Sequence, residues 1–347
     1  MTSKILQGHR VNSGLLNYFL KRLFILLLSF FLIVTINWLI PRMAPGNPVD
    51  VLISRMGLTG LQASAEQMRS YFLKAFALDK PLWEQYINFW LGLFQGDLGI
   101  SVYRFPTPVS EIIMEAIPYT VAPVAPALLV SWYIGNKLGA LAAKKRLLDN
   151  ILVPLAYYLA NAPYFWLGVV LQFVFSVELC KSTPICLPSG FPYSRGLTPS
   201  LNVTFLWDAF MHWILPFASY VLVQMGGWMI GMRNMIIYEL GSNYAKYMED
   251  LGFSDSMLSK YVYRHALLPQ VTGLGIQIGM LVSLGVAVEF VFSYPGLGYY
   301  LVNAIQNRDY FLTQGIVLVV TISVLVANFI IDILYGVLDP RTRLTEQ

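Results

Sequence analysis

Residues 23–40, LFILLLSFFLIVTINWLI, form an apolar run with no charged side chain. A helix needs about 20 such residues to cross the hydrocarbon core of a bilayer, so this run predicts a membrane-spanning helix. A secretory signal peptide would be shorter and would end in small residues at a cleavage site. This run instead ends at Ile40, directly before Pro41 and Arg42. We therefore expect an anchored first span.

Five further segments have the composition and length of a span. They are residues 119–142, 151–179, 209–232, 267–289 and 314–338. Pro163 lies inside the third segment and predicts a break between a short interfacial approach and the span proper. The chain is 56% hydrophobic and only 12% charged, which is outside the usage of soluble domains. We expect an all-α, polytopic membrane protein with six transmembrane helices and both termini on one side.

Basic residues indicate which side that is. Cytoplasmic loops of membrane proteins carry an excess of Lys and Arg, and here the basic residues gather at the loops on the side of the N-terminus. They are Lys21, Arg22, Lys144, Lys145, Arg146, Arg233, Lys246, Lys260, Arg264, Arg341 and Arg343. We expect a protein of the plasma membrane with both termini in the cytoplasm. The net charge of +4 is then a topology signal, and no basic face for nucleic acid is expected.

Residues 41–116 connect the first two spans and are too long for a simple loop. Their mixed composition predicts a small folded subdomain outside the cell. The expected organisation is therefore a cytoplasmic N-terminus with the first span in residues 1–40, an external subdomain in 41–116, and a five-helix core in 117–347.

The two cysteines of the chain, Cys180 and Cys186 in CKSTPIC, fall in a loop that this topology places outside the cell. That compartment permits a disulfide. Sequence spacing alone does not establish the geometry of a bridge, so two free thiols at the end of a helix are the alternative.

Motifs of catalytic or nucleotide-binding sites are absent from the sequence. It has no G-x-x-x-x-G-K-[ST] phosphate loop, no H-E-x-x-H and no G-x-S-x-G. Its three histidines, His9, His212 and His265, lie on different segments and predict no metal site. We expect no catalytic, cofactor-binding or metal-binding residue in this chain, so an energy source would have to lie in another polypeptide.

Polar residues inside the predicted spans are candidates for function, because burying them in a membrane is costly. Asn328 and Asp332 are four residues apart and share a helix face. They could line a pathway, but we favour hydrogen bonding between helices. Gln224 and Gln277 could likewise face a cavity, and Glu289 stands where the fifth span ends, where a structural role is favoured.

Residues 244–269, YAKYMEDLGFSDSMLSKYVYRHALLP, are charged although they lie between the fourth and fifth apolar segments. They predict a first helix over 243–251, a C-cap at Gly252, and a second helix that Ser254 or Asp255 caps. The pattern puts Tyr244, Met248 and Leu251 on one face of the first helix. Such an apolar knob within a charged rim resembles a protein docking site. An amphipathic helix resting on lipid headgroups is the alternative.

The same residues resemble the coupling motif of ATP-binding-cassette importer permeases, in which a glycine is followed about seventeen residues later by Leu-Pro. Here Gly252 leads to Leu268 and Pro269. Further segments, in the same order, resemble the B-type permeases of the dipeptide and oligopeptide transport family, which also includes nickel and oligosaccharide transporters. They are YFLKRLFILL, APGNPVD, LDKPLWEQY, GDLGIS, FWLGVVLQFVF, EFVFSYPGLG, NRDYFLTQG and DILYGVLDPRTR.

The resemblance implies a type I importer with several partners. This chain would pair with a second, homologous permease, two cytoplasmic ATPases carrying ATP and Mg²⁺ would dock on the coupling helices, and an extracellular solute-binding protein would deliver the solute. The coupling helices would be residues 243–266, and Pro269 would end the motif. The docking residues would be Tyr244, Lys246, Tyr247, Met248, Glu249, Asp250, Leu251 and Gly252.

The sequence departs from the family pattern at several of these positions. Tyr247 and Met248 replace small residues, and Glu249, Asp250 and Leu251 stand where this branch favours basic residues. We expect the docking to be kept with a reshaped partner surface. His265 is displaced from its usual place, so we assign it no role, and Asn47 replaces the usual aspartate.

The resemblance favours peptides as substrate. Oligosaccharides are the alternative, because the specificity of such importers lies largely in the binding protein and not in this chain. A channel or secondary carrier that works alone would not need the cytoplasmic helix pair. A membrane enzyme would need a cluster of titratable groups at one depth, which Asp332 alone does not supply.

Overall fold

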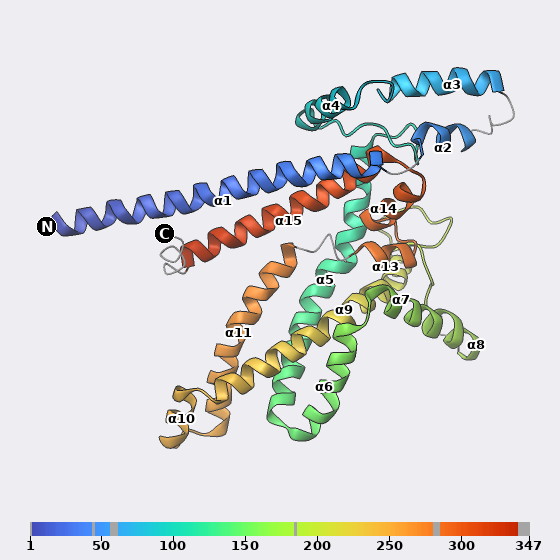
Figure 1. The fold of residues 1–347 in the computed structure, drawn as a ribbon. Coiled ribbons are helices and arrows are strands. Elements are labelled where there is room, and N and C mark those ends of the chain that lie inside the picture. The colour runs from blue at the N-terminus through green and yellow to red at the C-terminus, as the bar shows by residue number, and fades with distance from the viewer. Residues whose placement is uncertain (1, 44–45, 56–61, 184–185, 280–284, 339–347) are drawn as a thin grey trace. The chain divides into compact units, whose positions relative to one another are not determined.

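The computed structural model describes residues 2–43, 46–55, 62–183, 186–279 and 285–338, and in these residues the chain is all-α, as the sequence predicts (Figure 1). The helices are α1 (Thr2–Met43), α2 (Pro48–Arg55), α3 (Gln62–Ala75), α4 (Leu82–Gln95), α5 (Val109–Lys144), α6 (Arg146–Asn161), α7 (Tyr164–Gln172), the π-helical turn η2 (Phe173–Glu178), α8 (Leu179–Ser182), α9 (Val203–Leu240), α10 (Asn243–Asp250), α11 (Asp255–Gly279), α13 (Val286–Val291), α14 (Leu297–Gln306) and α15 (Tyr310–Leu338).

The chain forms two compact units. The α1–α15 unit consists of Met1–Ala116 and Tyr300–Gln347, and the α9 unit consists of Ile117–Tyr299. This division follows the packing of the helices. The expected division into residues 1–40, 41–116 and 117–347 follows the predicted course of the chain through a membrane, and it stays a prediction.

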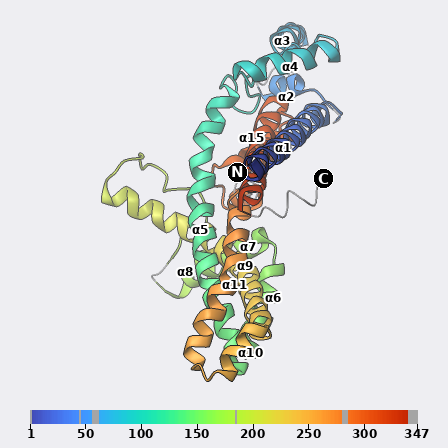
Figure 2. The ribbon, with the colours of Figure 1, turned by 90° about the vertical axis from the view of Figure 1, so that its left-hand side faces the viewer.

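The α1–α15 unit has at its centre the two long helices after which it is named, which lie side by side (Figures 1 and 2). Two amide side chains join them: Asn37 donates to the carbonyl of Gln314 at 3.0 Å, and the Gln314 side chain donates to the carbonyl of Trp38 at 3.0 Å. Such paired hydrogen bonds satisfy polar groups that an apolar environment would otherwise leave unpaired.

An apolar cluster of this unit lies in the connection between the first two predicted spans. Helices α2 and α3 and the loop after α4 pack through Val49, Leu52, Ile53, Phe72 and Val102. The loop after α4 is fixed by Asp309, whose carboxylate accepts from the hydroxyl of Ser101 at 2.6 Å and the amide of Tyr103 at 2.9 Å. This connection is therefore folded, while its position outside the cell stays a prediction.

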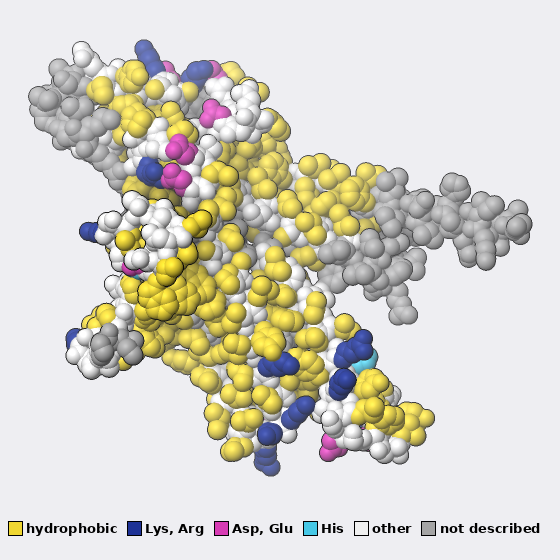
Figure 3. Space-filling view, turned by 180° about the vertical axis from the view of Figure 1, so that it is seen from behind, with side chains coloured by type: hydrophobic (Ala, Val, Ile, Leu, Met, Phe, Trp, Pro, Cys, Tyr) yellow, Lys and Arg dark blue, Asp and Glu magenta, His cyan; other side chains and the backbone are white. Residues whose placement is uncertain are grey.

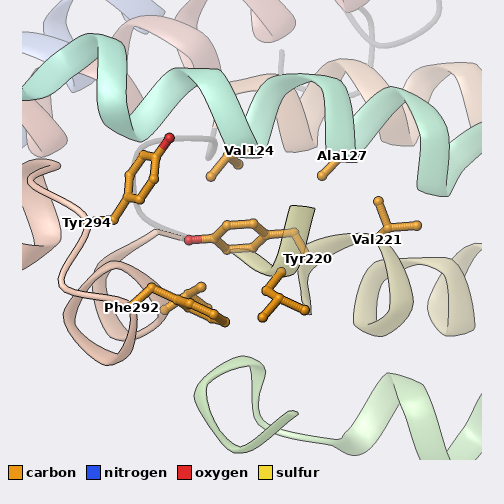
Figure 4. Close-up of a cluster of buried hydrophobic side chains, with 8 residues drawn as sticks. Val124, Ala127, Tyr220, Val221, Phe292 and Tyr294 are labelled. Atoms are coloured by element: carbon orange, nitrogen blue, oxygen red, sulfur yellow. The ribbon is translucent and has the colours of Figure 1, made fainter. Parts of the chain in front are cut away.

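The α9 unit is organised around α9, which packs against α6, α7 and α11. One of its apolar clusters surrounds the fully buried Tyr220. Figure 4 shows the Tyr220 ring between Val124 and Ala127 of α5 and Phe292, which follows α13. The Tyr220 hydroxyl donates to the carbonyl of Gly285 at 3.1 Å, so this buried aromatic residue has a partner for its polar end.

Five helices of the described residues are long and apolar enough to cross a membrane. They are Tyr18–Met43, Val109–Lys144, Tyr164–Ser182, Val203–Leu240 and Tyr310–Ile333. The break predicted at Pro163 is confirmed, because α6 ends at Asn161 and α7 begins at Tyr164 after an extended Ala162 and Pro163. Only the second part of the third predicted segment is thus a candidate span.

The fifth predicted span, residues 267–289, is only partly covered, because residues 280–284 lie outside the described residues. The second coupling helix and the beginning of this span form one continuous helix, α11, with Pro269 inside it. A proline lacks only its own N–H and disturbs the preceding turn, so Pro269 does not end this helix.

Candidate functional site

The charged stretch between α9 and α11 forms a helical hairpin at one end of the α9 unit. The Ser242 hydroxyl caps α10 by accepting from the amide of Ala245 at 3.4 Å. Gly252 has φ +79°, and the amides of Gly252 and Phe253 donate to the carbonyls of Glu249 and Met248. The predicted left-handed glycine after the first helix is therefore confirmed. Of the two predicted caps for the second helix, Ser254 is the one observed, and its hydroxyl accepts a hydrogen bond from the amide of Met257 at 3.4 Å.

The inner face of α10 is packed against three longer helices. Ala245 is fully buried, and Tyr244 and Met248 pack beside it. The cluster that receives them consists of Ala140 of α5, Met232 and Ile236 of α9, and Leu258, Val262 and Ala266 of α11. The helix is thus packed against α5, α9 and α11.

This packing corrects the predicted apolar knob of Tyr244, Met248 and Leu251. Tyr244 and Met248 face the interior, and only Leu251 of the three is exposed. The Tyr244 hydroxyl donates to the carboxylate of Glu239 at 2.7 Å. Burial, followed by this hydrogen bond, raises the pKa of Tyr244 to about 12. Tyr244 therefore keeps its proton at physiological pH and its bond to Glu239.

The outer face of the hairpin carries other apolar side chains. Tyr247 is 63% exposed, and Leu251, Phe253 and Met257 are exposed beside it. Lys246, Glu249 and Asp250 are exposed on the same short helix. Figure 3 shows hydrophobic side chains at the tip of this end of the unit, with Lys and Arg side chains gathered next to it. An exposed apolar tip with charged neighbours is typical of a surface that a partner covers.

The first part of α11 supports the hairpin. Val262 and Ala266 are buried in the cluster beneath α10, and the His265 ring lies 5.1 Å from the Tyr244 ring. His265 thus packs against the hairpin, although the sequence suggested no role for it. Leu268 and Pro269 are exposed.

A bidentate ion pair holds α6 to α9 near the same end of the unit. The guanidinium of Arg233 donates to the two carboxylate oxygens of Asp149 at 2.6 and 2.7 Å. These hydrogen bonds lower the pKa of Asp149. Bidentate pairs of this kind fix orientation as well as distance, so the helices next to the hairpin are joined to one another.

The polar residues of the predicted spans have different surroundings. Gln224 is buried and accepts a hydrogen bond from Ser131 at 3.4 Å, while its amide nitrogen has no partner among the described residues. The side-chain oxygen of Gln277 also lacks one there. Asn328 is exposed, and Asp332 lies 3.3 Å from the guanidinium of Arg22 on α1. Asp332 therefore connects α15 to α1.

Replacing Asp332 with Ala is expected to lower the yield of assembled complex without changing which solutes are preferred. Exposed ion pairs contribute about 0.2–1 kcal/mol, and because the pair with Arg22 joins α15 to α1, its loss weakens the packing of these two helices. The measurement is complex yield together with competition between solutes in uptake. Ile330→Ala, at an exposed position of the same helix, is the control. A fully assembled Asp332→Ala complex with altered solute preference would instead place Asp332 in the pathway.

The segment between α8 and α9 is fastened by interactions that the sequence did not reveal. Asp208 accepts from the hydroxyl and the amide of Ser194, both at 2.7 Å, and the Ser194 hydroxyl lies 3.3 Å from the His212 ring. The other ring nitrogen of His212 lies 2.8 Å from the carbonyl of Gly190. Because this nitrogen faces a backbone carbonyl and not a carboxylate, the cluster lacks the arrangement of a catalytic triad. It holds the loop against α9.

The same loop has three further attachments. Cys180 and Cys186 are joined by a disulfide. The amide of Phe191 donates to the carbonyl of Phe292 at 2.8 Å, and Gln172 donates to the carbonyl of Ser189. Several independent contacts thus fix this segment in the α9 unit.

Replacing both cysteines with Ser is expected to leave solute uptake within about twofold of the parent, because the bridge joins residues only 6 positions apart and a disulfide stabilises a short loop least. The loop keeps its bonds to Phe292 and Asp208. The measurement is the uptake rate in matched vesicles, with dithiothreitol treatment of the parent as a second route. Loss of uptake in both experiments would make the disulfide essential.

Glu289, which the sequence places at the end of the fifth predicted span, is a buried carboxylate. It is 1% exposed, and it accepts from the amides of Gly298 at 2.7 Å and Tyr299 at 3.4 Å in the first turn of α14. Thr120 of α5 accepts from the next free amide of that turn, Leu297, at 2.9 Å. Glu289 and Thr120 therefore cap α14 and join it to α5 and α13.

Two glycines make room for this carboxylate. A Cβ atom built at Gly285 would lie 2.4 Å from one carboxylate oxygen of Glu289, and a Cβ atom built at Gly296 would lie 2.2 Å from the other. Position 296 of the EFVFSYPGLG segment is therefore a glycine because a larger side chain would collide with Glu289. The repeated glycines of this segment were the available sequence signal for a tightly packed turn.

Comparisons with known proteins agree with this geometry. The profile of the family described as "Binding-protein-dependent transport system inner membrane component" matches residues 135–344, which include the hairpin. The dipeptide transport system permease protein DppB of Escherichia coli is 31% identical over 347 residues, covering 95% of this chain and 99% of the relative.

Two further relatives have similar names. The di/tripeptide transport system permease protein DppB of Pseudomonas aeruginosa is 32% identical over 344 residues, covering 95% of this chain and 99% of that protein. The oligopeptide transport system permease protein AppB of Bacillus subtilis is 32% identical over 314 residues, covering 89% of this chain and 93% of that protein.

Proposed function

Because this chain belongs to the family of binding-protein-dependent transport system inner membrane components, we propose that it is the permease subunit of a peptide importer driven by ATP hydrolysis in partner subunits. The chain is a multi-pass protein of the plasma membrane and a transport component, not an enzyme. The observation that carries the proposal is the hairpin of α10 and α11, which combines an exposed apolar tip with a buried connection to the long helices.

The tip of the hairpin is the proposed docking site for an ATPase. Tyr247 and Leu251 would insert into the partner, with Phe253 and Met257 at their side, because these apolar side chains are exposed without contacts that would hide them. Glu249 and Asp250 add negative charge to this surface, so a complementary ATPase cleft would be apolar with basic residues at its rim. Gly252 and the segment that ends at Pro269 would hold the docking helix in place.

The buried face of α10 supports a mechanical role for the same hairpin. Ala245, Tyr244 and Met248 pack on α5, α9 and α11, so a displacement of α10 by the ATPase would reach all three helices. Protein interiors are close-packed and transmit strain. We infer that ATP binding, by closing the two ATPases, would switch the spans between inward-facing and outward-facing arrangements.

The proposed assembly has three kinds of protein partner besides the lipid bilayer. A second, homologous permease would complete the pathway, two ATPases with ATP and Mg²⁺ would bind at the cytoplasmic side, and a solute-binding protein would deliver the solute outside. Both termini would lie in the cytoplasm, in accord with the basic residues on that side, and residues 41–116 would lie outside. Six spans would require a fifth span that includes residues 280–284, in addition to the five candidate helices.

Peptides are the proposed solutes, because the relatives above are named as dipeptide, di/tripeptide and oligopeptide permeases. Nothing in those names supports oligosaccharides. Among the polar residues of the spans, we propose packing roles for Asp332, which pairs with Arg22, and for Gln224, which lies in the interior. Gln277 and Asn328 remain candidates for the pathway.

The experiment that tests the proposal is purification of this subunit in mild detergent with identification of the proteins bound to it, followed by reconstitution in vesicles. The expected result is recovery of a second permease and ATPases, and ATP-dependent uptake of a labelled dipeptide once the binding protein is added. Recovery of the chain alone, still able to move solute without ATP, would contradict the proposal. Uptake of a sugar but no peptide would contradict its substrate only.

A further inference from the structure

Helix α4 (Leu82–Gln95) has the composition of a membrane-associated helix, although it belongs to the connection expected outside the cell. No charged residue occurs from Gln85 to Gln95, a stretch with the sequence QYINFWLGLFQ. The charges stand at its two ends, where Lys80 pairs with Glu84 and where Asp97 follows Gly96. An apolar stretch of about 10–14 residues is typical of a buried, re-entrant or interfacial helix.

The part of the chain that the structure describes does not bury this helix. None of the residues of α4 is buried. Phe94 is 81% exposed and Trp83 66%, and Ile87 and Leu91 are exposed between them. Because these positions recur every three or four residues, they form one apolar stripe along the helix. We call residues 83, 87, 91 and 94 the outer stripe of α4.

Other side chains of α4 contact the membrane-spanning part of α1. The Tyr86 hydroxyl lies 2.7 Å from the Thr35 hydroxyl, and the Tyr86 ring lies 5.1 Å from the Trp38 ring. The Trp90 ring stacks on Phe31 at 5.7 Å between ring centroids. These contacts place the turn of α4 that carries Tyr86 and Trp90 directly against α1.

The contacted part of α1 defines the depth of α4 in the membrane. Phe31, Thr35 and Trp38 all lie in the charge-free run 23–40. At about 1.5 Å per residue, Trp38 and Phe31 are roughly 8 and 18 Å from the end of α1 at Met43. The hydrocarbon core is about 30 Å thick, so a helix in contact with both residues lies below the membrane surface.

We propose that α4 lies in the bilayer leaflet at the Met43 end of α1, with its outer stripe against the lipid acyl chains. The span α1 likewise has exposed apolar side chains that would face lipid, among them Phe24, Leu28 and Leu32. Trp83, near the charged end of the helix, would lie at the headgroup level that tryptophan prefers. Part of the connection expected outside the cell is therefore a membrane-embedded element.

This inference requires that α1 crosses the membrane. It does not depend on the proposed peptide substrate or on ATPase docking at α10. A membrane position for α4 would also explain why its apolar side chains stay uncovered in a protein whose loops face water, because an exposed apolar surface in water is unfavourable by roughly 25 cal/mol per Å².

The test uses one introduced cysteine at a time. The chain has two cysteines, which are joined in a disulfide, so an introduced cysteine is the sole free thiol of this subunit. Ile87→Cys and Leu91→Cys report on the outer stripe, and Ser70→Cys on the exposed surface of α3 is the matched control. Each variant is labelled with a nitroxide in the purified complex with its partner subunits, whose own thiols are replaced. The complexes are then placed in vesicles of phosphatidylethanolamine and phosphatidylglycerol.

The readout is the collision rate of each nitroxide with oxygen, which concentrates in lipid, and with a water-soluble nickel chelate. The expected result is a ratio of oxygen to nickel collisions several-fold higher at residues 87 and 91 than at residue 70. Higher nickel collisions at 87 and 91 would place α4 in water and overturn the proposal. Low collision rates with both reagents would show that protein, such as the second permease, covers the stripe, and would overturn it as well.

Discussion

Replacing Gly252 with Val is expected to reduce ATP-driven uptake by about tenfold or more, while the complex still assembles. Gly252 has φ +79°, a conformation that costs a residue other than glycine about 1–3 kcal/mol, and a β-branched residue lies at the upper end. Every 1.4 kcal/mol is a factor of about ten in population. The turn would therefore leave the geometry that holds α10 on α11, and the docking tip would be displaced.

Two controls separate backbone strain from steric hindrance. No atom lies within 4 Å of a Cβ atom built at Gly252, so a side chain has space there. Asn tolerates the left-handed region, and Gly252→Asn is expected to keep most of the uptake. Gly227→Ala, in an equally open position inside α9, is expected to have little effect. The measurements are uptake, ATP hydrolysis and co-purification of the ATPase. Normal uptake by Gly252→Val would contradict the docking role of this turn.

The hairpin shows what local sequence can and cannot predict. The positive φ at Gly252 follows from chemistry within a few residues and was predicted, and the cap at Ser254 is one of the two that the sequence offered. The exposed face of α10 was predicted wrongly. Its eight residues carry Tyr244 on one side and Tyr247 on another, so the apolar pattern alone does not choose between them. Packing on α5, α9 and α11 buries Tyr244 and leaves Tyr247 exposed.

The spans show a similar limit. Apolar length predicted α1, α5, α9 and α15 well, because crossing a bilayer is a requirement on composition. It did not predict that α11 continues through Pro269, since a proline stops some helices and only bends others. Nor did it separate α4 from the rest of its connection. The contacts of Tyr86 with α1 join residues about fifty positions apart, and no local pattern contains that information.

The long-range polar contacts were the least predictable part. His212, Ser194 and Asp208 come together through a loop whose path the sequence does not determine. A structural role was expected for Glu289, but the residues that contact it were not predicted. One of them, Thr120 on α5, is far away along the chain. Such residues have no mutual spacing that a sequence pattern could reveal.

Replacing Glu289 with Ala is expected to lower the melting temperature of the assembled complex by several degrees. The change removes the acceptor for the amides of Gly298 and Tyr299, and losing a hydrogen bond to a charged partner costs about 1.5–3 kcal/mol. In a unit of this size each kcal/mol corresponds to roughly 2–4 °C. The measurement is thermal unfolding of the purified complex, with yield as a second readout.

Glu289→Gln distinguishes the hydrogen bonds from the charge. Its side-chain oxygen can accept from the same amides of α14, so this variant is expected to stay close to the parent. Glu178→Ala, which removes an exposed carboxylate that pairs with Lys181, is expected to be neutral. If Glu289→Ala melted with the parent, capping of α14 would not be what this buried carboxylate contributes. If Glu289→Gln were as unstable as Glu289→Ala, the negative charge would matter more than the acceptor, because the glutamine keeps the oxygen and loses only the charge.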